Sequence, residues 1–298
     1  IRQSAGLGKS PKLKDPDIYD HRNIHCDVLV VGAGISGILA AKNAAKNNYK
    51  TLLLDEKNEL GGSTIYENNE SNKIDNKISS EWLKKEIEEL KNIKNLEIKT
   101  RTSVAAYHQY NYLLARENLT DHLEKKDKIN KIRQRLLKIR AKKVILATGA
   151  LERPMVFNNN DRPGIMLSSA IKKYSDFYGV ACGRKIIFFT NNDSAYESAL
   201  SLNDKGIKVE AVVDIRKQSE TNLEKRVIDA GIKIYWEHTV VDTSGYKRLN
   251  NVSIMKLSND GTSVTGNKIS ISCDCLGVAG GWTLSLIHIS EPTRPALI

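Results

Sequence analysis

The stretch that decides the fold is HCDVLVVGAGISGILAAKNAAKNNYKTLLLDE, residues 25–56. Residues 28–31 form an apolar run of Val and Leu, which is typical of a buried parallel strand. A helix is expected from about Ser36, because apolar residues then recur at a spacing that lets one face pack on a sheet. A second strand is expected at residues 51–54. This order predicts a β-α-β unit of a dinucleotide-binding sheet.

Three glycines lie between the first strand and the helix, in the order GxGxxG. Gly32 permits the tight turn, Gly34 lets the backbone approach a pyrophosphate, and Gly37 allows the helix to pack closely on the strand. The N–H groups around Ser36, together with the positive end of the helix, would hold the phosphates. A bare glycine triplet is weak evidence, but its position between a strand and a helix predicts a dinucleotide site.

An acidic residue stands where the ribose is expected. Asp55 ends the second strand, about twenty residues after the glycines, where a carboxylate accepts hydrogen bonds from ribose hydroxyls. Glu56 and Lys57 lie next to it in the chain. Because an acid at this position disfavours a 2′-phosphate, the site favours NAD or FAD over NADP.

Three later segments extend the predicted site. The ELGGS segment turns back over the phosphates, and its Ser63 can offer a hydroxyl and an N–H. Two short strands follow, and the backbone around Val104 is expected near the adenine. A further strand at residues 144–147 ends in the turn Thr148-Gly149, and ligands of open α/β sheets lie outside such carboxyl ends of strands.

The same pattern repeats in the second half of the chain, with one change. A strand is expected at residues 186–189, a helix at 194–202 and another strand ending at Asp214. The turn between the first strand and the helix is TNND, residues 190–193, and it has no glycine. Side chains would fill the space where a pyrophosphate must touch backbone, and Asp193 would add negative charge there, although it could cap the helix. We predict that this unit is retained for packing and binds no dinucleotide.

Composition bounds the class of protein. The chain has 298 residues, 40% hydrophobic and 27% charged, which is ordinary for a soluble globular protein of one or two domains. No apolar run is long enough to predict a membrane span. The formal charge of +11 comes from lysines scattered along the chain, without a basic stripe interleaved with aromatic residues. We therefore predict neither a membrane nor a nucleic-acid partner.

Catalytic and metal-binding patterns are not found in the sequence. The cysteines include no CxxC pair and are not spaced as zinc ligands are, and this pattern is typical of reduced thiols in a cytoplasmic protein. A pyridine nucleotide–disulphide reductase needs a redox dithiol and two working nucleotide sites, so that enzyme class is not expected. The histidines are scattered, without the partners that nucleophilic catalysis needs. We assign no catalytic residue and no metal ligand among Cys26, Cys182, Cys273, Cys275, His21, His25, His108, His122 and His238.

The expected fold class is α/β, with two Rossmann-like dinucleotide-binding units as in two-domain pyridine nucleotide and flavin oxidoreductases, the second unit being degenerate. We expect residues 25–155 and 273–283 to form the first domain and residues 156–272 an inserted second domain. Residues 1–24 are expected to be a linker from a region that precedes Ile1 in the natural chain. The final LSLIHISEPTR resembles an in-frame translation of a sequencing adapter, so residues 284–298 are expected to be a non-native tail.

Several stretches point to a family. DEKNELGGS (residues 55–63), ERPMVFNNNDRPGIML (152–167), TNNDSAY (190–196) and VAGGW (278–282) together resemble the α subunit of heterotetrameric sarcosine oxidase. The resemblance covers essentially residues 1–283. The stretches at 152–167 and 190–196 are not general features of nucleotide-binding folds, and the degenerate turn is itself a mark of this family.

The resemblance implies a complex that oxidatively demethylates sarcosine to glycine, with hydrogen peroxide and formaldehyde or methylene-tetrahydrofolate as further products. In the family, sarcosine is oxidised at FAD in the β subunit, which also holds a covalent FMN. The α subunit binds a non-covalent NAD and assembles with the β, γ and δ subunits. Tetrahydrofolate binds a region of the α subunit downstream of the part matched here.

The family's NAD contacts are carried over only onto matching positions. They are Gly32, Gly34, Ser36, Gly37, Asp55, Glu56, Lys57, Ser63 and Val104, with Thr148 and Gly149 as further candidates. One alternative is the FAD-binding subunit of a related opine, proline or cyanide-forming dehydrogenase. Another, from a different class, is a basic scaffold or RNA-binding protein, against which Asp55 and the glycine loop argue.

Overall fold

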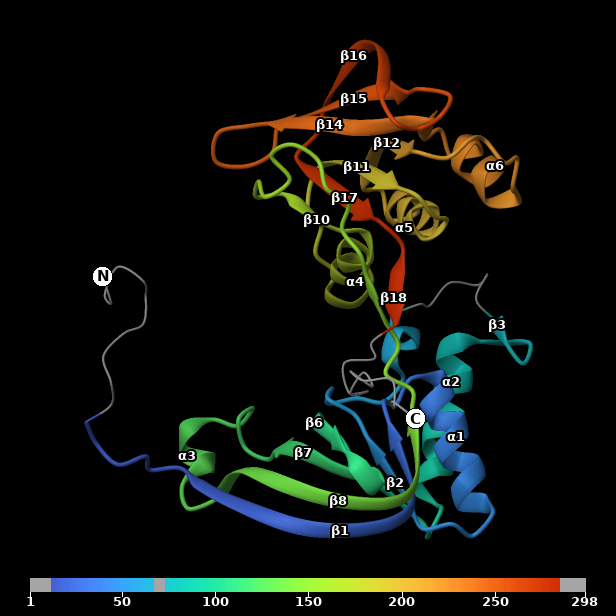
Figure 1. The fold of residues 1–298 in the computed structure, drawn as a ribbon. Coiled ribbons are helices and arrows are strands. Elements are labelled where there is room, and N and C mark those ends of the chain that lie inside the picture. The colour runs from blue at the N-terminus through green and yellow to red at the C-terminus, as the bar shows by residue number, and fades with distance from the viewer. Residues whose placement is uncertain (1–11, 67–72, 285–298) are drawn as a thin grey trace, which may run out of the picture. The chain divides into compact units, whose positions relative to one another are not determined.

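The computed structural model describes residues 12–66 and 73–284, and these form two compact units (Figure 1). The first unit comprises residues 12–62 and 83–148. The second unit comprises residues 63–66, 73–82 and 149–284. The predicted tail at 284–298 lies outside the described residues except for Leu284. Each unit has its own hydrophobic core, so each is described by itself.

The first unit is built on a six-stranded sheet in the order β5-β2-β1-β8-β7-β6. Strands β5, β2, β1 and β8 are parallel, and β8, β7 and β6 form an antiparallel meander. Its elements are β1 (Ile18–Val31), α1 (Ile35–Lys46), β2 (Thr51–Leu54), β5 (Leu96–Lys99), β6 (Thr102–His108), η2 (Gln109–Asn111), β7 (Tyr112–Asn118), α3 (Lys125–Lys128) and β8 (Ile132–Leu146). Helix α2 (Ser79–Lys91) belongs to this unit from Leu83 onward.

The core of the first unit lies between the parallel strands and the meander. Leu52 and Leu54 of β2 pack with Val104 of β6 and with Leu113 of β7 in one apolar cluster. On the helix side, Lys42 of α1 forms ion pairs with two glutamates of α2, at 2.6 and 2.7 Å. The βαβ unit predicted from residues 25–56 is confirmed, and its helix begins at Ile35, one residue before the expected start.

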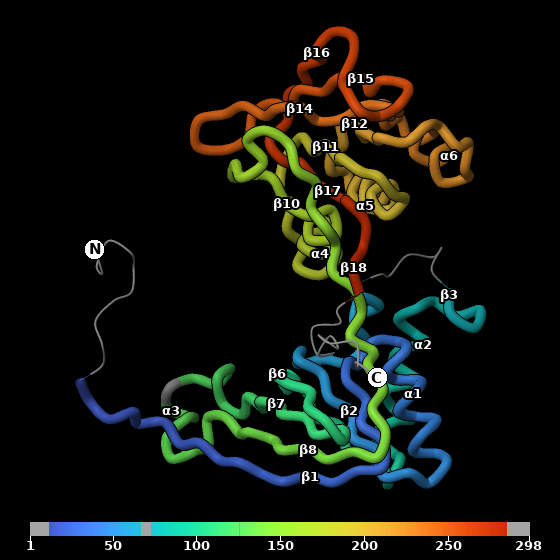
Figure 2. Tube along the Cα trace, in the orientation of Figure 1, coloured from blue at the N-terminus to red at the C-terminus, as the bar shows by residue number. Residues whose placement is uncertain are grey.

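Strand β1 is much longer than predicted. The linker assigned to residues 1–24 is wrong for residues 18–24, because these residues pair in parallel with β8 from Ile18 onward (Figure 2). The strand was missed because this segment is polar. Its side chains are held by ion pairs, including Asp20 with Arg135 at 2.8 Å, rather than by apolar burial. The strand expected at residues 144–147 is the end of a much longer strand, β8, which begins at Ile132.

The second unit contains a parallel sheet in the order β10-β17-β11-β12-β13 and an antiparallel sheet in the order β14-β15-β16. Two short pairs, β3-β4 and β9-β18, complete it. Its elements are η1 (Gly62–Ile65), β3 (Lys73–Ile74), β4 (Lys77–Ile78), β9 (Ala150–Glu152), β10 (Ile165–Leu167), α4 (Ser168–Tyr178), β11 (Lys185–Thr190), α5 (Ser194–Asn203), β12 (Lys208–Asp214), α6 (Asn222–Asp229), β13 (Lys233–Trp236), β14 (His238–Ser244), β15 (Asn251–Leu257), β16 (Val264–Ser272), β17 (Cys275–Ala279) and β18 (Trp282–Leu284).

Alternation along β11 explains the layers of the second unit. Ile186 and Phe188 pack with residues of α4, α5 and α6, such as Tyr196. Ile187 and Phe189 point the other way, into a cluster with residues of the antiparallel sheet such as Val252. The parallel sheet is therefore covered by helices on one face and by the three-stranded sheet on the other.

The predicted domain limits need two corrections. The strand near residues 273–283 was assigned to the first domain, but β17 lies between β10 and β11 in the second unit's sheet. The structure also changes unit after Thr148 rather than after residue 155. Within the described residues, no helix has both the length and the apolar character needed to cross a bilayer.

Candidate dinucleotide site and its degenerate counterpart

Two of the loop glycines are required by close backbone contacts. Gly32 has a φ of +97°, and a Cβ there would lie 2.2 Å from the carbonyl oxygen of Ala147. A Cβ on Gly37 would lie 1.8 Å from the carbonyl oxygen of Gly32. Any side chain at these two positions would force β1, α1 and the end of β8 apart.

Gly34 has a different role, because a Cβ there would meet nothing within 4 Å. Its backbone is extended, with φ −72° and ψ −175°, and it stands at the N-cap of α1 without a side-chain cap. In the described parts of the chain, the N–H groups of Ile35, Ser36 and Gly37 have no hydrogen-bond partner. The open space beside Gly34, these donors and the positive end of α1 fit the pyrophosphate of a dinucleotide.

Asp55 lies at the carboxyl end of β2 and is 9% exposed. The N–H of Ala33 donates to its Oδ2 at 2.6 Å, and the N–H of Lys57 donates to its Oδ1 at 2.8 Å. The carboxylate therefore fixes the glycine loop as well as standing at the expected ribose position. Glu56 is exposed beside it and Lys57 is half-buried.

The double glycine packs directly on the glycine loop. The N–H of Gly61 donates to the carbonyl of Ala33 at 2.7 Å. A Cβ on Gly62 would lie 3.0 Å from the Cα of Gly34. Ser63 follows and is exposed, whereas the buried hydroxyl of Thr64 has no hydrogen-bond partner within the described residues. The sequence analysis expected this close approach from the double glycine and named Ser63 as the contact, but it did not single out Thr64.

The remaining predicted residues border the end of the parallel strands. Val104 is buried in β6, the strand that begins where the N–H of Thr102 donates to the carbonyl of Asp55 at 2.8 Å. Thr148 follows Ala147, whose N–H donates to the carbonyl of Val31 at 2.8 Å. Gly149 has a φ of +70° and is the first residue of the second unit. The structure thus brings the glycine loop, Asp55 and the strand of Val104 together in the first unit.

The equivalent turn of the second unit is filled by its own side chains. The Thr190 hydroxyl donates to the carbonyl of Asn192 at 2.7 Å and accepts from its N–H at 3.0 Å. The Asn192 amide donates to the carbonyl of Ala279 at 3.0 Å, and its Oδ1 accepts from the N–H of Ser194 at 3.1 Å. The donors at the start of α5 are therefore partly used within the turn itself.

Asp214, the acidic residue at the end of β12, also has its carboxylate bound by protein side chains. The hydroxyl of the fully buried Tyr196 donates to Oδ2 of Asp214 at 2.8 Å. The Arg216 guanidinium bridges Asp214 and Asp193, at 2.8 Å from each carboxylate. The suggestion that Asp193 caps α5 is wrong, because its side chain makes no cap hydrogen bond. Asn192 supplies that hydrogen bond instead, while Asp193 pairs with Arg216.

The cysteines lie in environments that suppress thiolate formation. Burial raises the pKa of Cys26 to about 11 and the pKa values of Cys273 and Cys275 to about 12. All four cysteines are free thiols. Because the thiolate is the reactive form, these three buried side chains are poorly suited to disulphide exchange.

The comparisons with known proteins agree with this geometry. The model of the pyridine nucleotide-disulphide oxidoreductase family matches residues 26–287. The chain belongs to this family. Thioredoxin reductase of Lactococcus lactis, a solved structure, superposes with a TM-score of 0.66 at 20% identity, covering 90% of this chain and 81% of that one. At that identity the likeness shows the fold alone, and it confirms the predicted α/β class with two Rossmann-like units.

Curated relatives show which members of the family this chain is similar to, namely sarcosine oxidase α subunits. The sarcosine oxidase α subunit of Corynebacterium sp. (strain P-1) is 37% identical over 98% of this chain. That of Rhizobium meliloti is 34% identical over 97% of this chain. The chain spans 30% and 28% of the length of these two relatives. The predicted resemblance to sarcosine oxidase α subunits is confirmed, and this member of an oxidoreductase family matches one part of them.

Proposed function

We propose that this chain is the NAD-binding portion of the α subunit of a sarcosine oxidase complex. In this proposal the dinucleotide lies on the glycine loop of the first unit and is held without a covalent bond. The amine oxidation takes place at flavin in the β subunit, so no residue of this chain is catalytic.

The observation that carries the proposal is the contrast between the two units. In the first unit, Gly34 faces open space and the first N–H groups of α1 have no partner among the described residues. In the second unit, the Asn192 side chain fills the corresponding turn, and Arg216 pairs with Asp214, the acidic residue that corresponds to Asp55. This contrast supports one dinucleotide per chain. Asp55 and Glu56 favour a dinucleotide without a 2′-phosphate.

The rest of the proposal follows from the similarity to sarcosine oxidase α subunits. We infer β, γ and δ partner subunits and sarcosine as the substrate of the complex. FAD and FMN belong to the β subunit in this proposal. Tetrahydrofolate belongs to a part of the α subunit that the matched segment does not cover.

The deciding experiment identifies the bound nucleotide. The chain is co-expressed with its partner subunits, the subunits are separated, and the nucleotide released from each is identified by mass spectrometry. NAD on this chain, with flavin on the partner only, is the expected result. FAD on this chain would replace the proposal with a flavin-binding dehydrogenase subunit, and two nucleotides would contradict a silent second unit.

Gly34→Ala tests the position of the phosphates. The alanine Cβ meets no protein atom and the backbone angles suit alanine, so the unliganded fold should change by no more than about 0.5 kcal/mol. The methyl group fills the pyrophosphate space, so retained nucleotide should fall at least about tenfold. Asn192→Ala, the matched change in the second turn, should leave nucleotide content unchanged. Full retention in Gly34→Ala would contradict the site.

A further inference from the structure

Strand β1 has an open edge over half of its length. On one side β8 pairs with β1 from Ile18 to Val31, but on the other side β2 pairs only with Val28 to Val31. The last contact on that side is the hydrogen bond from the N–H of Asp27 to the carbonyl of Lys50, at 2.8 Å. Residues 18–26 therefore present a strand edge with no neighbouring strand among the described residues. Such an edge is a template for another strand.

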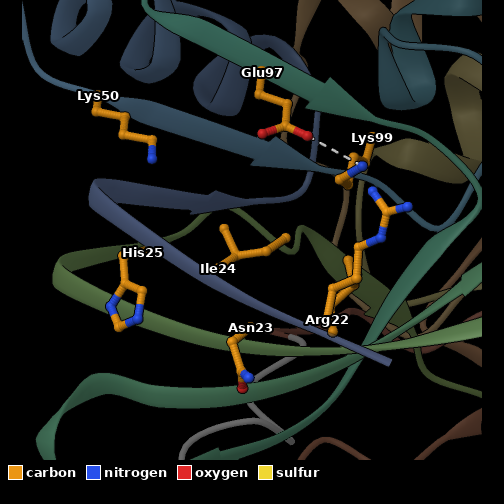
Figure 3. Close-up of a pocket in the computed structure, with 8 residues that line it drawn as sticks. Arg22, Asn23, Ile24, His25, Lys50, Glu97 and Lys99 are labelled. Atoms are coloured by element: carbon orange, nitrogen blue, oxygen red, sulfur yellow. Dashed lines mark ion pairs between the residues drawn. The ribbon is translucent and has the colours of Figure 1, made fainter. Parts of the chain in front are cut away.

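A hollow of about 370 Å³ adjoins this open edge. It lies within the first unit, and Figure 3 shows Lys50, Glu97 and Lys99 on one side of it and residues 22–25 of β1 on the other. Leu137 is fully buried and, with the half-buried Ile24, gives the hollow an apolar portion. Its lining residues are Arg22, Asn23, Ile24, His25, Lys50, Glu97, Lys99 and Leu137.

Among the side chains that line the hollow, three are cationic, Arg22, Lys50 and Lys99, and one is acidic, Glu97. Lys99 is neutralised by Glu97 at 3.1 Å and by Glu117 at 3.2 Å. Arg22 lies 3.4 Å from Asp20 and its side chain remains 60% exposed. The Lys50 ammonium has no ion pair or hydrogen bond within the described parts of the chain, and Figure 3 shows it pointing into the space between the strands. The hollow thus offers positive charge to a ligand.

We propose that the open edge of β1 and this hollow form the docking surface for an extended, acidic segment of a partner subunit. The segment would add to β1 as a strand, place carboxylates near Lys50 and Arg22, and rest an apolar side chain on the half-buried Ile24. This inference rests on the proposed role as a subunit of a complex.

Two other occupants fit the surface less well. A small anion would use the cations but not the row of main-chain groups along residues 18–26. A second copy of this chain would bring a further formal charge of +11 to a positive surface.

The proposed docking surface is separate from the dinucleotide site, because Lys50 precedes β2 whereas Asp55 follows it. Changes at Lys50 therefore leave the glycine loop intact.

The test uses the assembled complex. Hydrogen exchange of the amides of residues 18–26 is compared between the isolated chain and the complex, and the double variant Arg22→Glu, Lys50→Glu is tested for co-purification. We expect exchange of these amides to slow at least about tenfold in the complex. We expect the double variant to lose at least about tenfold in complex yield. The double variant Lys84→Glu, Lys91→Glu makes the same charge change at two exposed positions of α2, and it should assemble normally with an unchanged nucleotide content.

The outcomes separate this inference from the proposed function. If the complex forms while residues 18–26 exchange at the same rate, the docking surface is wrong and the subunit assignment stands. If no complex forms with any partner subunit, both are wrong. Protection that depends on the concentration of the isolated chain would replace the partner with a second copy. If inorganic phosphate or citrate protects these amides in the isolated chain and the partner subunits do not, the ligand of the surface is a small anion and not a partner segment.

Discussion

Asp55 combines a structural and a binding role in one carboxylate. Its two oxygens accept backbone N–H groups of Ala33 and Lys57, and in the proposed function it also binds the ribose. In Asp55→Asn, one of these N–H groups would face an amide donor and the ribose would lose its charged acceptor. We expect dinucleotide affinity to fall by about 1–3 kcal/mol, measured by titration calorimetry.

The control for Asp55 lies in the second unit. Asp214 ends β12 in the same way, and the N–H of Arg216 donates to its Oδ1 at 2.8 Å, as Lys57 does for Asp55. Asp214→Asn should leave dinucleotide affinity unchanged. Equal affinity in Asp55→Asn and the unmodified chain would show that the ribose lies elsewhere.

Glu152 predicts a pH dependence of stability. Its side chain is 7% exposed, its Oε2 accepts from the N–H of Ser169 at 2.8 Å, and its Oε1 has no partner within the described residues. Burial raises the pKa of Glu152, against the opposing effect of hydrogen bonding from Ser169. The folded state therefore binds the proton more tightly than the unfolded state. The stability contributed by Glu152 is complete below the unfolded pKa and is lost as pH rises through the folded pKa.

Glu152→Gln removes this titration. We expect the variant to gain stability relative to the unmodified chain as pH rises above the ordinary pKa of a glutamate, measured by urea unfolding from acidic to neutral pH. Glu88→Gln, on exposed α2, should track the unmodified chain throughout. A constant difference between Glu152→Gln and the unmodified chain across this range would mean that Glu152 does not titrate with folding.

Single residues of the site were predictable where the local sequence alone determines the backbone conformation. The GxGxxG spacing required specific backbone positions, and the structure gives Gly32, Gly34 and Gly37 the predicted steric environments. Asp193 was harder, because its partner Arg216 lies in the bend after β12 and cannot be found by local capping rules. Thr64 carried no signal beyond the neighbouring double glycine.

At the scale of elements, the second unit has internal hydrogen bonds at the positions where a dinucleotide-binding unit would contact its ligand. Tyr196 of α5 reaches Asp214 at the end of β12, and burial, together with that neighbouring carboxylate, raises the pKa of Tyr196. The hydroxyl therefore stays protonated and donates. This hydrogen bond joins the helix to the strand at the place where the first unit leaves donors for a ligand.

Tyr196→Phe tests this internal replacement. Asp214 would keep its contacts with Arg216 and lose one buried donor, so unfolding free energy should fall by about 1–2 kcal/mol. Nucleotide content should not change, as measured on the same preparation by mass spectrometry. Tyr246→Phe, at a side chain 94% exposed, serves as the matched control. A loss of nucleotide in Tyr196→Phe alone would mean that the second unit takes part in binding.

Elements were predictable where their cores are apolar and local. The helix at 194–202, the strand at 186–189 and the strand end at Asp214 were predicted within one or two residues, because their apolar spacing follows from burial in the core. The first half of β1 was missed for the opposite reason. Its residues are polar, and the strand exists because β8 pairs with it from far along the sequence.

At the scale of the whole chain, strand order was the part that sequence could not provide. β17 is separated from β11 by β12 to β16, yet it lies beside β11 and supplies a central strand of the second unit's sheet. An apolar run such as residues 275–279 fits the centre of either parallel sheet. The choice is made by long-range packing, including the contact of Gly277 with Phe188.

Gly277→Ala follows from that packing. A Cβ at this position would lie 2.6 Å from the ring of Phe188 and 3.0 Å from the Cδ1 of Ile171. Overpacking at a central strand should cost the second unit about 1–3 kcal/mol. Because each unit has its own core, amide exchange should accelerate in β11, β12 and α4 while α1 and β2 keep their protection. The dinucleotide should remain bound. Equal loss of protection in both units would mean that the chain unfolds as one cooperative body, and a loss confined to the first unit would return β17 to the sheet that the sequence first suggested.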